Sequence, residues 1–315
     1  MKSYNHKSGT NEYIANYGDC KDMSKIKDGQ IQLIFTSPPY YNLKDYSTKP
    51  KKQENQTPHS PKEHNQTYEE YLSEMLQVWK ECTRVLSDDG VLIINIDVIK
   101  FKAKNGNIIP IPFDFISQCS KIGLGCKDIW IYKKLTGVPF QLGKKLKNRH
   151  EYLLVFSKGN KYKWNIDDVR EPYSKNYIYP EGHKRRNPIG QAPSSVWEFF
   201  PPFQTGNHHY HYCPFPDGMV DRAIKLFTDK NDWVLDPFLG SGKVVARAKA
   251  LGRNGIGYEI NEHFSEVIEK MINKTPHSSE LVKQETSTKK VKVHTLSRFI
   301  IEHQQKINEG KLKEY

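Results

Sequence analysis

One nine-residue string has the residue types of a ligand-binding turn. Residues 234–242 read VLDPFLGSG, in which Asp236 ends an apolar run and Gly240 and Gly242 precede a helical pattern. A glycine-rich turn between a strand and a helix directs backbone N–H groups and a positive helix N-terminus toward a ligand. Glu259 ends the next predicted strand, where a second carboxylate can accept the hydroxyl protons of a ribose. The pattern predicts a nucleoside-binding site.

The same turn discriminates between two nucleoside cofactors. A dinucleotide-binding turn has a third glycine in the pattern G-x-G-x-x-G, but this chain has Val245 at that position. A carboxylate at Asp236 would sit poorly against a pyrophosphate, whereas it suits the cationic end of S-adenosylmethionine. We therefore expect S-adenosylmethionine rather than NAD.

A second string, FTSPPYYN at residues 35–42, directly follows the predicted strand IQLIF. Two consecutive prolines fix the backbone and remove two N–H donors. The rigid turn can present the Ser37 hydroxyl, the Pro38 carbonyl and the Tyr40 ring at the end of the strand. An amino group held there finds acceptors for its hydrogens, and a planar base finds a ring on which to stack.

The charge balance favours a polyanionic partner. The 315 residues include 48 Lys and Arg against 36 Asp and Glu, a net charge of +12. Cations that replace counterions on phosphates favour nucleic-acid binding. No apolar run reaches the ~20 residues of a membrane-spanning helix. The N-terminal residues lack the apolar core of a secretory signal, and five cysteines without a C-x-x-C pair favour reduced thiols, so we expect a cytoplasmic protein.

Alternating strand and helix patterns must position both strings. Apolar runs predict buried strands at residues 31–36, 91–97 and 152–157, with a further strand in IWIYKK, and helical spacing marks residues 68–86, capped by Thr67, and IPFDFISQCSKIG. In the second half we expect helices at residues 219–227 and 244–251 and strands at 233–236 and 255–259. The order predicts an α/β fold with a doubly wound, mostly parallel sheet.

Composition predicts four regions. We expect residues 1–157 to form a catalytic half that contains a mobile loop at 47–66. Residues 158–206 are expected to form an irregular target-recognition insertion, with a solvated surface excursion as the alternative. Residues 207–274 form a cofactor-binding half, and residues 275–315 form a polar linker and a C-terminal helix.

Together, S-P-P-Y and D-P-F-x-G-S-G resemble the motifs of the S-adenosylmethionine-dependent DNA methyltransferases that modify amino groups, in the permuted β group where the catalytic motif comes first. NYGDC at 16–20, NRHEYLLVFSKG at 148–159 and HYCPFPDGMVDRAI at 211–224 agree in order, so that the resemblance covers roughly residues 13–270. It implies a Rossmann-like methyltransferase fold, double-stranded DNA as substrate and a restriction-modification system with a possible cognate endonuclease. A monomer or a homodimer is expected.

The resemblance also implies roles for individual residues. The catalytic residues would be Ser37, Pro38, Pro39 and Tyr40, and the cofactor-binding residues would be Asp19, Phe215, Pro216, Asp236, Pro237, Phe238, Gly240, Ser241, Gly242 and Glu259. Members usually carry Thr or Ser after G-S-G, whereas this chain has Lys243, whose ammonium could pair with the cofactor carboxylate or point to solvent.

Direct attack by an exocyclic amine needs positioning and hydrogen-bond acceptors but no covalent enzyme intermediate. Since the target base lies inside a duplex, we expect base flipping, with Tyr40 stacked on the extruded ring. Ser37 is the residue that this family associates with cytosine N4, which we favour over adenine N6. A DNA-binding protein that has lost catalysis is the remaining alternative.

Basic clusters are the expected phosphate contacts. They comprise Lys51, Lys52, Lys144, Lys145, Lys184, Arg185 and Arg186. His208, His209, His211 and Cys213 crowd together, but no second ligand pair accompanies them, so we expect no metal site.

Overall fold

The computed structural model describes residues 2–41, 66–100, 107–136, 146–174, 178–202 and 215–279. Contacts divide the chain into two units, Met1–Ser278 and Ser279–Tyr315. Every helix and strand below belongs to the first unit.

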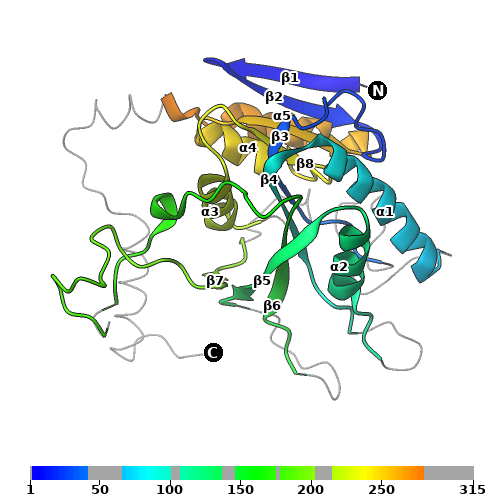
Figure 1. Cartoon of the computed structure of the whole chain (residues 1–315). Helices are drawn as coiled ribbons and strands as arrows, with labels where there is room; N and C mark the ends of the chain where they lie inside the picture. Colours follow the sequence, from blue (N-terminus) through cyan, green and yellow to red (C-terminus); the bar gives the residue numbers. More distant parts are fainter. Residues whose placement is uncertain are drawn as a thin grey trace, which may run out of the picture. The chain divides into compact units, whose positions relative to one another are not determined.

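A nine-stranded sheet forms the centre of this unit, in the order β1-β2-β9-β8-β3-β4-β6-β5-β7 (Figure 1). Its strands are β1 (Lys2–Ser8), β2 (Asn11–Tyr17), β3 (Ile31–Thr36), β4 (Leu86–Ile96), β5 (Gly125–Lys134), β6 (His150–Ser157), β7 (Val196–Phe199), β8 (Trp233–Asp236) and β9 (Asn254–Glu259). The five strands from β2 to β4 are parallel neighbours, while β6 runs antiparallel to both β4 and β5. The sheet is therefore mostly parallel, as the sequence predicted.

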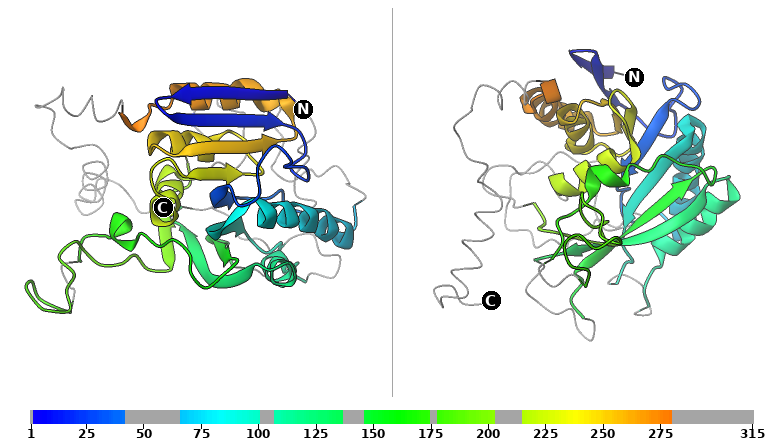
Figure 2. Two further views of the ribbon diagram at one scale, coloured as in Figure 1. Left: turned by 45° about the horizontal axis from the view of Figure 1, so that its top comes forward. Right: turned by 60° about the vertical axis from the view of Figure 1, so that its left-hand side comes forward.

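Helices cover both faces of the sheet (Figures 1 and 2). Helices α1 (Tyr68–Val85) and α2 (Ile111–Lys121) pack on one face, and α3 (Asp217–Phe227), α4 (Lys243–Ala250) and α5 (Ser265–Lys274) pack on the other. Alternation along β3 explains the two layers, because Ile34 joins the core under α1 while Leu33 and Phe35 join the core under α3 and α4. The fold is a doubly wound α/β sheet.

Helix α1 begins where its cap was predicted. The Thr67 side chain accepts a hydrogen bond from the Glu70 backbone N–H, and the Glu70 carboxylate accepts one from the Thr67 N–H. This reciprocal capping box satisfies two backbone donors at the start of the helix. Tyr71, Met75 and Trp79 face the core from the buried side of α1.

Two parts of the sheet were missed by the sequence analysis. Strands β1 and β2 form an antiparallel hairpin whose turn contains Gly9, with a φ of +61°. Strand β2 then pairs in parallel with β9, which lies more than 200 residues further along the chain. Strand β7, inside the irregular region, pairs in parallel with β5.

Several sequence predictions concern residues outside those described. They include most of the 47–66 loop and the C-terminal helix. The four predicted regions stay predictions. Within the described ranges, no helix is long and apolar enough to span a membrane.

Candidate active site

Both predicted motifs lie at one edge of the sheet. Strand β3 ends at Thr36 and pairs in parallel with β8, which ends at Asp236, with Leu33 opposite Val234. The carboxyl ends of neighbouring parallel strands meet at the same edge, where open α/β sheets bind their ligands. The turn after Asp236 and the corner after Thr36 are consequently neighbours.

The turn after β8 is held by one backbone hydrogen bond to β9 and by another within the turn. The Leu239 N–H donates to the Tyr258 carbonyl over 2.8 Å, and the Gly242 N–H donates to the Leu239 carbonyl over 2.9 Å. Gly240 and Gly242 have φ values of +55° and +83°, in the region that favours glycine. Gly242 precedes α4, so the glycines allow the chain to reverse directly into the helix.

A third glycine, Gly257 on β9, allows close packing under this turn. A Cβ atom at Gly257 would lie 2.6 Å from Leu239 Cδ1 and 3.0 Å from the Asp236 carbonyl oxygen. Any side chain there would displace the turn. The sequence analysis did not single out this residue, because its role depends on the pairing of β9 with β8.

The Asp236 carboxyl group is almost wholly buried, with 2% of the residue exposed. Its Oδ1 accepts hydrogen bonds from the Thr36 hydroxyl at 2.7 Å and from the Phe238 N–H at 3.1 Å. Burial raises the pKa of Asp236 to about 7, although these two hydrogen bonds act against it. The group therefore exchanges its proton close to neutral pH.

Glu259 supplies the second carboxylate. Its Oε2 accepts a hydrogen bond from the Gly240 N–H and its Oε1 accepts one from the Asn261 N–H, both at 2.9 Å. Burial raises the pKa of Glu259, and the two N–H donors oppose that effect. Each oxygen keeps acceptor capacity for a further hydrogen.

The double-proline corner is fixed by helix α1. The buried Tyr71 hydroxyl donates to the Pro39 carbonyl over 3.0 Å. Because prolines fix φ and lack N–H groups, this bond and the strand before Ser37 determine the direction of the corner. The sequence analysis placed Tyr71 within a predicted helix without singling it out, and the sequence carried no signal for this contact.

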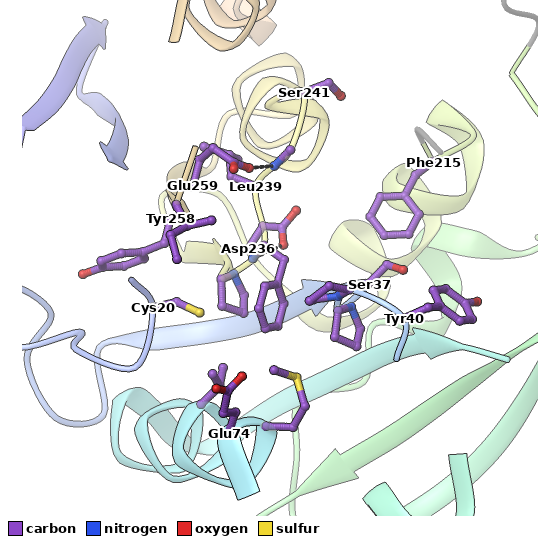
Figure 3. A pocket seen from close by; sticks show the side chains of 18 of the residues that line it. Cys20, Ser37, Tyr40, Glu74, Phe215, Asp236, Leu239, Ser241, Tyr258 and Glu259 are labelled. Carbon is purple, nitrogen blue, oxygen red and sulfur yellow. Dashed lines mark hydrogen bonds between the residues drawn. The ribbon is translucent and has the colours of Figure 1, made fainter. Parts of the chain in front are cut away.

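A pocket of about 400 Å³ joins the corner to the turn. In Figure 3, Asp236 lies between Glu259 on one side and the pair Ser37 and Tyr40 on the other. The predicted catalytic and cofactor-binding residues that line it are Asp19, Ser37, Pro38, Pro39, Tyr40, Phe215, Asp236, Pro237, Phe238, Gly240, Ser241 and Glu259. Pro216 and Gly242 adjoin the pocket in sequence without lining it.

Two predicted residues close the sides of the pocket. Phe215 packs edge-on against Phe35, with ring centroids 4.9 Å apart. Asp19 is held by its own loop, since its carboxylate accepts from the Lys21 N–H at 2.9 Å and pairs with the Lys21 ammonium at 3.1 Å.

Lys243 lines the pocket and pairs with a residue of α3, and its pairing with a cofactor carboxylate stays a prediction. Its ammonium lies 2.6 Å from Asp217 Oδ1 at the start of α3, so it pairs with a protein carboxylate. Arg247, one helical turn later, binds Asp221 through two hydrogen bonds of 2.6 Å. These ion pairs join α4 to α3, so the first residue of α4 has a structural contact of its own.

The far end of the pocket is lined by polar residues that the sequence analysis did not assign. Asp97 follows β4, Asn148 precedes β6, and Lys134 pairs with Glu151 at 2.5 Å. The Asn148 amide donates to Asp97 Oδ2. Burial raises the pKa of Asp97, although the hydrogen bonds from Asn148 and from the Val98 N–H oppose it.

Among the predicted DNA contacts, Lys51, Lys52, Lys144 and Lys145 lie outside the described residues. Lys184 and Arg185 are exposed. The Arg186 guanidinium lies 4.5 Å from the centroid of the Tyr173 ring, and Arg185 donates to the Tyr179 hydroxyl over 3.2 Å. The two arginines are held by aromatic side chains, and the contact of all these cations with DNA stays a prediction.

The cluster His208, His209, His211 and Cys213 also lies outside the described residues. Among the residues that are described, no three His, Cys, Asp or Glu side chains are grouped as metal ligands.

Comparison with known proteins gives a consistent family. The chain is 27% identical over 270 residues to the Type II methyltransferase M.BglII of Bacillus subtilis, a match that spans 82% of this chain and 68% of that protein. It is 30% identical over 280 residues to the Type II methyltransferase M.MjaI of Methanocaldococcus jannaschii, spanning 81% of this chain and 89% of that protein.

Two solved structures share the fold. The PvuII DNA methyltransferase (cytosine-N4-specific) superposes with a TM-score of 0.60 at 17% identity, over 82% of this chain and 92% of that one. A DNA modification methylase of Thermus thermophilus, in complex with S-adenosyl-L-methionine, superposes with a TM-score of 0.57 at 24% identity, over 83% and 94% of the two chains.

The family model described as DNA methylase, which covers enzymes of the N6 and N4 amino-group type, matches residues 31–270. This range includes the double-proline corner, the glycine turn and the strands that bring them together. The chain therefore belongs to the DNA methylase family of N6/N4 amino-group methyltransferases.

Proposed function

We propose that this DNA methyltransferase transfers a methyl group from S-adenosylmethionine to the exocyclic N4 of cytosine in duplex DNA. The observation that carries the proposal is that the Ser37–Tyr40 corner and the turn that contains Asp236 line the same pocket. Ser37, rather than the Asp or Asn associated with adenine N6, favours cytosine as the target.

The described residues fit the proposed cofactor. The buried carboxyl group of Asp236 faces a pocket, where an ionised form would attract a sulfonium and an ammonium group. Glu259 has acceptor capacity left for ribose hydroxyls, and Gly240 leaves room for close approach to its backbone. When bound, S-adenosylmethionine supplies an activated methyl group on a cationic sulfur.

The corner acts on the other reactant. The lone pair of a base amine is delocalised into its ring, so the residues around it must hold the nitrogen in line with the methyl carbon. The Ser37 hydroxyl and the Pro38 carbonyl offer acceptors to the amine, and Tyr40 offers a ring on which the extruded base stacks. Tyr71 keeps the corner in place through the Pro39 carbonyl.

The target base decides between cytosine N4 and adenine N6. Plasmid DNA is incubated with the purified protein and methyl-labelled S-adenosylmethionine, and its nucleosides are separated by mass spectrometry. Labelled N4-methylcytosine supports the proposal, whereas labelled N6-methyladenine would show that the target base is adenine. DNA retention without any labelled nucleoside would favour the binding protein that has lost catalysis.

The Type II naming of the relatives supports a role in restriction and modification. We propose that the chain works in the cytoplasm beside a cognate endonuclease that cuts the same site when unmethylated. Its oligomeric state, monomer or homodimer, stays open to measurement. Single-molecule sequencing of the methylated plasmid would identify the recognised site.

A further inference from the structure

One part of the pocket is lined by Asp97, Lys134, Asn148 and Glu151. It lies on the side of Ser37 that is remote from Asp236. In the sheet, β3 has β8 on one side and β4 on the other. Asp97 directly follows β4, and Asn148 lies two residues before the antiparallel β6, so both stand at the edge where β3 ends. A base whose amino group is held at Ser37 would therefore direct the rest of its ring toward Asp97 and Asn148.

Asn148 has a fixed orientation and an unused acceptor. Its Nδ2 donates to Asp97 Oδ2, and Asp97 Oδ1 accepts in turn from the Val98 N–H at 2.8 Å. The Asn148 Oδ1 atom is buried without a hydrogen-bond partner among the described residues. A buried acceptor without a donor is costly, and such atoms often mark a place where a ligand binds.

The backbone around Asn148 is also anchored. The Lys134 N–H at the end of β5 donates to the Arg149 carbonyl over 2.8 Å. The Lys134 ammonium pairs with Glu151, and both of these residues line the same pocket. The amide is therefore held from its side chain and from its main chain.

We propose that Asn148, oriented by Asp97, binds the Watson–Crick edge of the extruded target base. Its Oδ1 accepts one hydrogen of the exocyclic amine, and its second amide hydrogen donates to the adjacent ring nitrogen. The oxygens of Ser37 and Pro38 share the other amine hydrogen. This inference rests on the proposed function and extends it to the recognition of the base.

The pairing has a direct consequence for specificity. An acceptor beside a donor complements N4 and N3 of cytosine, and equally N6 and N1 of adenine. Guanine and thymine present a carbonyl oxygen beside an N–H, the reverse arrangement. Since the Nδ2 group is directed to Asp97, the amide cannot turn to fit them without losing that bond. Asn148 thus selects bases with an amino group.

The test uses Asn148→Leu, which keeps the shape of the side chain and removes both polar atoms. Asn160→Leu is the matched control, because Asn160 is exposed and accepts from Lys127 outside the pocket. Single-turnover methyl transfer is measured on a duplex that carries the mapped site. We expect Asn148→Leu to slow transfer by roughly tenfold or more while cofactor affinity changes by less than about twofold.

A second measurement separates recognition of the amine from a general loss of structure. The target cytosine is replaced by pyrimidin-2-one, which lacks the amine, and affinity for both duplexes is measured for the wild type and the variant. Any effect of easier base extrusion cancels in this cycle. The wild type should lose about tenfold more affinity than Asn148→Leu when the amine is removed. Asn148→Ala repeats the cycle if the leucine variant unfolds at a lower temperature.

Equal rates for Asn148→Leu and Asn160→Leu, together with no coupling in the cycle, would overturn the inference while leaving the proposed function intact. If the mapped base is adenine, the same cycle is run with purine in its place, and coupling would still support Asn148. A wild-type protein that methylates no DNA would overturn the proposed function and this inference with it.

Discussion

The affinity of the protein for its cofactor should increase with pH because of Asp236. The pKa of this buried carboxyl group is raised to about 7, so the group is mostly protonated at pH 5.5 and mostly ionised at pH 7.5. A cationic ligand favours the ionised form. If only that form binds, the dissociation constant should fall about 25-fold between pH 5.5 and pH 7.5.

Isothermal titration calorimetry with S-adenosylmethionine measures both the affinity and the proton. At pH 6, binding should release about 0.9 proton per site, which is obtained from experiments in two buffers with different ionisation enthalpies. The α-amino group of the ligand titrates at about pH 8 and stays charged over most of this range. The effect therefore reports on the protein.

Three variants assign the titration to a residue. Asp236→Asn should bind weakly with little dependence on pH, whereas Glu259→Gln should bind more weakly than the wild type and keep the dependence. Asp88→Asn, at a fully exposed carboxylate, should match the wild type. A wild-type affinity that is flat from pH 5.5 to 7.5, or the same slope in Asp236→Asn, would refute this assignment.

The same pKa fixes the sign of a stability effect in the ligand-free protein. The folded form keeps the Asp236 proton up to about pH 7, whereas the unfolded chain releases it near the ordinary value of 3.8. The free energy of unfolding should therefore fall as the pH rises from about 4 to about 7, with about 4 kcal/mol from this group. Urea titrations should show a smaller fall in Asp236→Asn than in the wild type, because Glu259 and Asp97, whose pKa values are also raised, contribute to the fall in both proteins.

Three further changes probe the corner and the basic surface. Ser37→Ala should lower the single-turnover rate at least about tenfold with unchanged cofactor affinity, and equal loss of both would contradict its role. Tyr71→Phe should also slow transfer by several-fold without weakening cofactor binding. Tyr68→Phe is the control and should keep the wild-type rate, because the Tyr68 hydroxyl donates to Asp114 instead. Similar rates for the two variants would contradict the role of Tyr71 in holding the corner. Arg186→Ala should weaken binding to all duplexes alike and reduce the salt dependence by about one unit, as seen in filter-binding assays at several salt concentrations. A change limited to one DNA sequence would instead indicate base contact.

Elements with strong local signals could be predicted from the sequence. Helix α1 combines a capping box with apolar residues at helical spacing, and β3 and β8 are compact apolar runs whose bounds were predicted at residues 31–36 and 233–236. In these segments local preference and tertiary burial agree, so that the pattern alone is sufficient.

The β1–β2 hairpin was missed because β1 lacks a strand pattern and because the pairing that joins β2 to the rest of the sheet is long-range. Strand β1 reads KSYNHKS and is largely exposed, so it lacks the apolar alternation of a half-buried strand. Strand β2 alternates buried and half-buried residues at its start, but its parallel neighbour β9 lies at the other end of the chain. The two-residue turn at Gly9 and Thr10 is the one local signal that could have revealed the hairpin.

The candidate site divides in the same way. Residues of the corner and the glycine turn are contiguous in sequence, so their types could be recognised as motifs. Tyr71 lies on a helix, Asn148 shortly before a strand and Gly257 inside a strand, and each acts at the site through tertiary contacts. A single sequence contains no spacing rule for such contacts. Asp97 did carry a signal, since a carboxylate that directly follows a buried strand stands at the functional edge of a parallel sheet.

One hydrogen bond joins the two halves of the chemistry. The Thr36 hydroxyl, fully buried at the end of β3, donates to Asp236 Oδ1 over 2.7 Å, and Thr36 is covalently bonded to Ser37. Ionisation of Asp236 strengthens a bond to a charged acceptor, which draws the last residue of β3 toward β8. If cofactor binding favours that ionisation, as predicted above, we expect it to strengthen this contact with the strand that carries the corner. The permuted order of the motifs leaves this contact unaffected, because sheet pairing rather than chain order makes β3 and β8 neighbours.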